Sequence, residues 1–136
     1  MRILAIDPGT HKAGIVVVDI VGAQYALHHR AIVSRDELKD TLQTLLAIYQ
    51  PERLLIGKGT GSRTLVPILR AQFPHLRWEL VKERNTTLQA RALYFRHHPP
   101  RGWRRWLPKG LRLPPEPYDD YAALALALQT VASEDD

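Results

Sequence analysis

The sequence predicts an α/β fold in which a mixed five-stranded β-sheet carries helices on both faces. Three apolar, strand-like segments follow one another over residues 1–33, as expected for an antiparallel meander. Amphipathic helical segments then alternate with short apolar strands, which is the pattern of parallel βαβ units. The expected element order is β-β-β-α-β-α-β-α-α, and a meander joined to parallel strands gives a mixed sheet.

The chain opens with a predicted β-hairpin that has an acid directly before its turn. The apolar run Ile3–Ile6 ends at Asp7, and Pro8-Gly9 supplies a tight turn into a second apolar run over residues 14–19. Asp is common in turns, so a turn role alone would also explain Asp7. A third strand is expected over residues 24–33, interrupted by His29. Its apolar side chains are expected on one face and its polar ones on the other, namely Tyr25, Leu27, Ala31 and Val33 against His28 and Arg30.

Helix and strand signals alternate after the meander. Ser34 and Glu37 form a capping-box pattern at the start of an amphipathic helix that ends before Pro51. A buried strand over residues 53–57 leads into the loop 58–62, which precedes a predicted helix over residues 63–73. The last strand is expected over residues 77–81.

The C-terminal third combines helices with one irregular segment. A second capping box at Thr86 predicts a helix to about His97. Six prolines fall within residues 99–117, which indicates a long irregular segment. An Ala-rich helix is then expected from Asp120 to about Val131.

Composition favours a protein that binds an anionic partner. The formal net charge is +5, and residues 91–112 hold seven Lys or Arg and no acid. The absence of cysteine excludes disulfides and thiolate metal sites. No apolar run is long enough to span a membrane, and no signal-like segment follows Met1. We therefore expect a single cytoplasmic domain covering residues 1–136, without a membrane partner.

Acidic side chains fall at the ends of three predicted elements. Asp7 closes the first strand, Glu83 follows the last strand, and Asp119-Asp120 begins the final helix. If the first and fourth strands are neighbours, Asp7 and Glu83 meet at one edge, where a helix packed over the sheet adds Asp120. Clustered carboxylates need a cation between them, and oxygen ligands favour Mg²⁺ or Mn²⁺. Helix capping alone would also explain Asp119 and Asp120.

These motifs resemble the YqgF/RuvX family in type and order over essentially the whole chain. The matching segments are Ile6-Asp7-Pro8-Gly9-Thr10 with Gly14, Glu83-Arg84 with Thr86-Thr87, and Asp119-Asp120-Tyr121-Ala122-Ala123. Two further segments look like the resolvase-like branch of this family, namely Gly57-x-Gly59-Thr60 and Lys109–Pro114.

The resemblance implies a ribonuclease H-like fold, shared with the RuvC Holliday-junction resolvases, and a divalent-metal nuclease. Such a nuclease would act as a Holliday-junction resolvase or mature precursor 16S ribosomal RNA. The resemblance also implies catalytic, metal-binding roles for Asp7, Glu83 and Asp120, with Asp119 as the alternative ligand. The chain departs from the pattern at Lys82, where many members have an acid, and it lacks a fourth acid on the last helix.

Cations and aromatic side chains mark the expected contacts with RNA or branched DNA. Arginines can neutralise phosphates while indole rings stack on unpaired bases, although the tryptophans could instead fill a hydrophobic edge of the domain. Two loops near the acids add further cations. The residues expected to contact nucleic acid are Thr10, Lys12, Lys58, Arg84, Arg101, Trp103, Arg104, Arg105, Trp106 and Lys109.

Three functional hypotheses follow. The first is a two-metal nuclease acting on structured nucleic acid. The second is a nucleic-acid-binding module that has kept the fold and lost catalysis, which the missing fourth acid motivates. An actin-like kinase fragment is disfavoured because one half cannot form a two-domain nucleotide cleft. A nucleoside triphosphate site at Gly57–Ser62 is disfavoured because the loop departs from the Walker pattern.

Overall fold

The computed structural model describes residues 1–22, 24–59, 61–82 and 119–134. The predicted helix from Thr86 to about His97 and the proline-rich segment 99–117 lie outside the described residues. None of the helices in the described part of the chain has the length and apolar character needed to cross a membrane.

Five strands form one mixed sheet in the order β3-β2-β1-β4-β5. The meander consists of β1 (Arg2–Pro8), β2 (Lys12–Val21) and β3 (Gln24–Ser34), which pair antiparallel. The strands β4 (Arg53–Lys58) and β5 (Trp78–Lys82) continue the sheet parallel to β1. The predicted α/β fold with a mixed five-stranded sheet is therefore confirmed.

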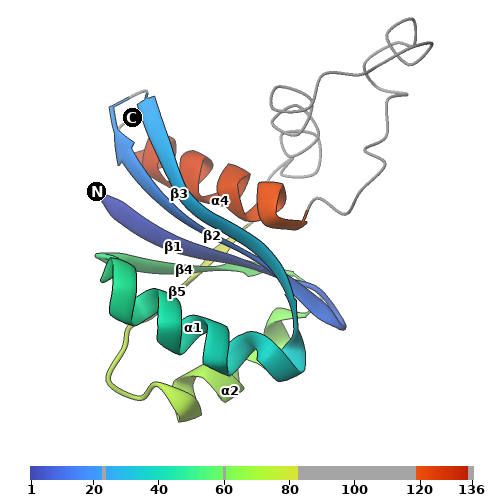
Figure 1. Cartoon of the computed structure of the whole chain (residues 1–136). Helices are drawn as coiled ribbons and strands as arrows, with labels where there is room; N and C mark the ends of the chain where they lie inside the picture. Colours follow the sequence, from blue (N-terminus) through green and yellow to red (C-terminus); the bar gives the residue numbers. More distant parts are fainter. Residues whose placement is uncertain (23, 60, 83–118, 135–136) are drawn as a thin grey trace, which may run out of the picture.

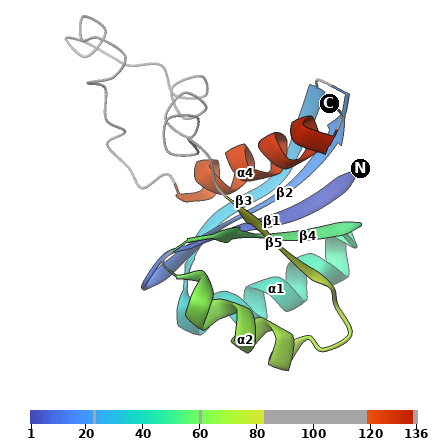
Figure 2. The ribbon, with the colours of Figure 1, turned by 180° about the vertical axis from the view of Figure 1, so that it is seen from behind.

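Helices cover the two faces of the sheet (Figures 1 and 2). On one face lie α1 (Arg35–Tyr49) and α2 (Ser62–Gln72), and on the other lies α4 (Asp119–Glu134). The first residues of α4 lie at the end of the sheet where β1 finishes, and both views agree on this placement. The start of α4 and the β1–β2 turn therefore lie at the same end of the sheet.

Side chains of β1 alternate between two hydrophobic clusters, as a strand buried on both faces requires. Leu4 and Ile6 pack with α1 and α2, whereas Ile3 and Ala5 pack with α4. All of these β1 side chains are fully buried. Since Asp7 follows Ile6, the alternation directs its carboxylate to the face that α4 covers.

The predicted arrangement of β3 side chains on one apolar face is wrong, because a β-bulge changes the face midway. Val17 pairs with His29 while the next β2 residue, Val18, pairs with Leu27, so His28 is the extra residue. Leu27 consequently packs on the α4 side and Val33 on the α1 side. The bulge also places Arg30 opposite Val16, on the same face as α4.

The capping box predicted at Ser34 is also wrong. Ser34 precedes α1 but makes no side-chain hydrogen bond to the helix start. It is the last residue of β3, paired with Lys12, so it remains part of the sheet. The first turn of α1 instead carries Asp36 and Glu37, whose charges favour the positive end of a helix dipole.

Candidate functional site

The candidate site lies at the end of the sheet where the parallel strands finish. Asp7 is half-buried near the end of β1, next to the turn that leads into β2. Its partner in β2 is Gly14, and on the other side Gly57 follows Ile56, which is the β4 partner of Ile6. Neither of these two sheet neighbours of Asp7 has a side chain.

Asp120 lies in the first turn of α4, and its side chain is almost completely buried at 6% exposed. Its Oδ1 accepts a hydrogen bond from the backbone N–H of Tyr121 at 3.0 Å. Its Oδ2 accepts one from Nη1 of Arg30 at 3.2 Å. The Arg30 guanidinium also lies 5.1 Å from the centre of the Tyr121 ring, a cation–π distance.

Asp7 and Asp120 come from distant parts of the chain to the same end and face of the sheet. Arg30, the ion-pair partner of Asp120, is the register partner of Val16 on β2. Val16 is in turn the register partner of Ala5 on β1. Ala5 precedes Asp7 by two residues on β1, so its side chain shares the face of Asp7. The register thus places two of the predicted acids on one face of the sheet, and their shared role in a site stays a prediction.

The other predicted ligands cannot be placed in the same way. Glu83 follows the last residue of β5 and lies outside the described residues, as does the side chain of Asp119. Residues 83–118 also contain most of the predicted nucleic-acid contacts, namely Arg84, Arg101, Trp103, Arg104, Arg105, Trp106 and Lys109. Within the described ranges, no group of three or more His, Cys, Asp or Glu residues could hold a metal ion.

The donor chemistry of Asp7 and Asp120 fits a hard divalent cation such as Mg²⁺ or Mn²⁺, because both supply carboxylate oxygens. The ion pair sets a condition on this fit. Arg30 already neutralises Asp120, so a cation bound at Oδ2 would compete with the guanidinium. The metal role of Asp120 stays a prediction.

Three other predicted contact residues lie exposed at this same end. Thr10 is in the β1–β2 turn, Lys12 begins β2, and Lys58 ends β4. The turn is tight, because the N–H of Gly9 donates to the carbonyl of Lys12 at 2.8 Å. By strand alternation Lys12 shares the sheet face of Asp7, whereas Lys58 lies on the α2 face at the same end of the sheet.

Arg35, which the sequence does not mark as functional, joins the two loops at this end. Its Nη2 donates to the carbonyl oxygens of Gly9 and Gly61, each at 2.8 Å. Its Nη1 donates to Oγ1 of Thr64 at 2.8 Å. The turn after Asp7 and the β4–α2 loop are thereby held together by one side chain.

Gly61 shows how closely these two loops approach. A Cβ atom at this position would lie 2.4 Å from the carbonyl oxygen of Gly9 and 2.8 Å from that of Pro8. No larger residue fits without separating the loops. The partners of Arg35 lie 26 and 29 residues away along the chain, so no local pattern could reveal this contact.

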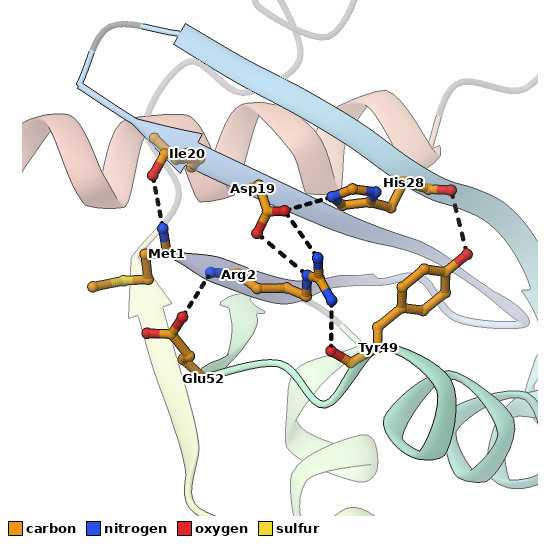
Figure 3. Close-up of polar contacts among 7 residues, drawn as sticks. All are labelled: Met1, Arg2, Asp19, Ile20, His28, Tyr49 and Glu52. Carbon is orange, nitrogen blue, oxygen red and sulfur yellow. Dashed lines mark hydrogen bonds and ion pairs between the residues drawn. The ribbon is translucent and has the colours of Figure 1, made fainter.

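A second polar cluster lies at the opposite end of the sheet and has a structural role (Figure 3). Asp19 accepts hydrogen bonds from Arg2 and contacts the His28 ring, and Arg2 also donates to the carbonyl of Tyr49 at 3.0 Å. The hydrogen bonds from Arg2 and His28 lower the pKa of Asp19 to about 2. The cluster ties β1, β2, β3 and the end of α1 together.

Comparison with solved structures shows the same fold in Holliday-junction resolvases. Thermus thermophilus RuvC in complex with a Holliday junction substrate has 20% sequence identity and a TM-score of 0.68, covering 99% of this chain and 96% of that chain. The fowlpox virus resolvase in complex with Holliday junction DNA has 10% identity and a TM-score of 0.62, with both chains covered completely.

These likenesses confirm the ribonuclease H-like fold that the resemblance implies. No protein-family model matches the sequence, and comparison with curated protein sequences gives no match. The finer resemblance to the YqgF/RuvX family stays a prediction.

Proposed function

We propose that this chain is a divalent-metal-dependent nuclease that hydrolyses phosphodiester bonds in branched nucleic acid. The observation that carries the proposal is the position of Asp7. It lies where the central strand of a resolvase-like fold ends, with Gly14 and Gly57 on either side and Lys12 on the same face. Branched DNA is the favoured substrate because the two resolvase structures named above are complexes with Holliday junctions. Precursor 16S ribosomal RNA is the alternative substrate.

In the proposed reaction, Asp7, Glu83 and Asp120 hold Mg²⁺ or Mn²⁺, with Asp119 as the alternative to Asp120. The metal would supply an activated water and stabilise the leaving oxygen. The chain itself orients the scissile strand: Lys12 and Lys58 attract its phosphates to the end of the sheet. Arg35 keeps the turn next to Asp7 in place through its hydrogen bonds to Gly9 and Gly61.

The Arg30–Asp120 pair favours a second candidate function. A guanidinium that already neutralises the buried carboxylate reduces the charge available to attract a cation. If Arg30 keeps this position when nucleic acid is bound, the chain would bind structured nucleic acid without cleaving it. The two candidates share the binding surface and differ only in metal binding and turnover.

A substrate panel tests the proposal. The purified chain would be incubated with four-way DNA junctions, duplex DNA, single-stranded DNA and structured RNA, with and without Mn²⁺. Junction cleavage that requires Mn²⁺ and exceeds duplex cleavage supports the resolvase-like assignment, and preferential RNA cleavage supports the alternative substrate. Junction binding without cleavage at any metal concentration would leave the binding module as the function.

A further inference from the structure

A cavity outside the acidic site lies between the start of α2 and β5, the edge strand of the described sheet. Its volume is about 360 Å³, near the lower end of the range of roughly 300–1,000 Å³ typical of small-ligand pockets. It is on the α2 face of the sheet, whereas Asp7 faces α4. The lining residues are Lys58, Gly59, Ser62, Arg63, Val66, Pro67 and Leu80.

The charged residues around this cavity are all cations. Lys58 and Arg63 are exposed, and neither forms an ion pair with any residue that the structure describes. Lys58 is also the register partner of Lys82 on β5. Like charges placed directly opposite each other on neighbouring strands destabilise a sheet. An anion bound at this end would remove that repulsion, whereas no acid among the lining residues does so.

The remaining wall of the cavity is apolar and accessible. Leu80 belongs to β5 and is 47% exposed, whereas the leucines of β1 and β4 are buried. Val66 and Pro67 face it from α2. An apolar wall beside a cationic rim suits a ligand that has an anionic group attached to an apolar ring.

We propose that this cavity receives one unpaired nucleotide of the bound nucleic acid. The phosphate contacts Lys58 and Arg63, and the base packs against Leu80 and Pro67, as bases do when they leave a stack for an apolar pocket. The inference rests on the proposed function in one respect, because the occupant is part of the same nucleic acid. It adds a preference for substrates with an unpaired nucleotide near the cleaved bond.

The cavity is physically connected to the acidic site. The loop that contributes Gly59 and Ser62 to the cavity continues through Gly61, which abuts the carbonyls of Pro8 and Gly9. Arg35 fixes this contact. A nucleotide held in the cavity therefore has a fixed position relative to the turn that follows Asp7.

The test uses the full chain in EDTA, so that binding is measured without cleavage. The probe is a four-way DNA junction with one unpaired 2-aminopurine nucleotide at the branch, compared with the same junction fully paired. We expect Leu80→Ser to weaken binding of the unpaired probe by about tenfold and to leave the paired junction unaffected. The rise in 2-aminopurine fluorescence that accompanies extrusion of the base should also be lost.

Charge variants test the other half of the proposed cavity. Lys58→Gln and Arg63→Gln should weaken binding of both junctions and flatten the dependence of log K on log salt by about 0.7–0.9 per lost phosphate contact. The matched controls are Ile68→Ser for Leu80→Ser and Arg70→Gln for the charge variants. Both change exposed α2 residues that do not line the cavity. Both controls should bind like the wild type.

Equal losses in the variants and their controls would overturn the inference, as would equal weakening of both junctions by Leu80→Ser. Because Leu80 is exposed, we expect an unchanged thermal transition in Leu80→Ser, which separates lost binding from lost folding.

Metal-dependent cleavage with normal binding of the unpaired probe by Leu80→Ser would overturn the proposed nucleotide cavity and leave the nuclease proposal standing. A selective binding loss in a chain that never cleaves would support the cavity and refute the nuclease. Failure of the wild type to bind either junction would overturn both.

Discussion

Arg30 and Asp120, ninety residues apart in the sequence, form an ion pair between β3 and the first turn of α4. The β-bulge at His28 makes this contact possible, because it places Arg30 on the face of the sheet that α4 covers. The pair links the first turn of α4 to β3. It also means that Asp120 can bind a metal ion only in competition with a cation of the chain.

The first prediction concerns Arg30→Gln. Without metal, this variant leaves the carboxylate of Asp120 buried without its counter-charge. We expect a loss of about 1–3 kcal/mol in the free energy of unfolding, less than for a fully buried pair because Arg30 is 44% exposed. Mn²⁺ should raise the melting temperature of the variant more than that of the wild type, because it replaces the guanidinium.

The control for this prediction is the double variant Arg30→Gln/Asp120→Asn. It removes both charges, so it should lose the added response to Mn²⁺ while folding more stably than Arg30→Gln alone. Arg70→Gln removes an exposed arginine from α2 and should resemble the wild type. An equal Mn²⁺ response in Arg30→Gln and the double variant would mean that Asp120 is not a metal ligand.

The second prediction concerns the loop contact made by Arg35. Arg35→Gln removes three hydrogen bonds from a charged donor, and we expect it to lower the free energy of unfolding by about 2–4 kcal/mol. The free energy of unfolding of Arg35→Lys should fall between those of Arg35→Gln and the wild type. An ammonium keeps the charge but lacks the planar fork that reaches all three acceptors. Urea unfolding measures both, with Lys39→Gln as the matched α1 control.

Gly61→Ala tests the same contact without changing a charge. The added methyl group would overlap the carbonyl oxygen of Gly9, so the loops must separate, at a cost of about 1–3 kcal/mol. If the two loops act as one unit, Arg35→Gln in the Gly61→Ala background should cost less than it does in the wild type. Additive losses would show that the contact does not couple them.

The third prediction is a pH dependence caused by Asp19. Its pKa is lowered from 3.8 to about 2 in the folded chain, so folding favours the ionised form. The corresponding stability is present above about pH 4 and is lost as the pH falls towards about 2. Asp19→Asn should therefore be less stable than the wild type at pH 7, and the difference should shrink below about pH 4.

Urea unfolding of both proteins at several pH values between about 7 and 3 measures this difference. Asp40→Asn, which changes an exposed α1 carboxylate, serves as the control and should show no comparable trend. A stability difference for Asp19→Asn that stays constant over this range would contradict the role assigned to the Arg2 and His28 contacts.

The sequence predicts the parts of this fold that depend on local patterns. The apolar runs around Ile3 and Ile15, and the periodicity that begins at Leu38, correctly predict strands and a helix. The position of Asp7 at the end of the first strand is likewise predicted, because the apolar run stops there.

Contacts that depend on pairing between distant segments leave no pattern in the sequence. His29 interrupts the alternation in β3, but only the register with β2 shows that the interruption is a bulge that turns Arg30 towards α4. Ser34 satisfies the local capping pattern and still remains in the sheet, because its strand partner is Lys12. Arg35 gives no local signal, since its side-chain partners lie far away in the sequence, in two loops and in α2.

The most direct test of the proposed nuclease compares the wild type with Asp7→Asn on a four-way DNA junction in Mn²⁺. The substitution keeps the size of the side chain and removes its charge, so folding and junction affinity in EDTA should be unchanged. We expect Mn²⁺-dependent cleavage to fall by at least about 100-fold, because even changes beyond the metal ligands cost 10–100-fold in metal enzymes. Cleavage by Asp7→Asn at the wild-type rate would contradict the nuclease site proposed at the end of β1.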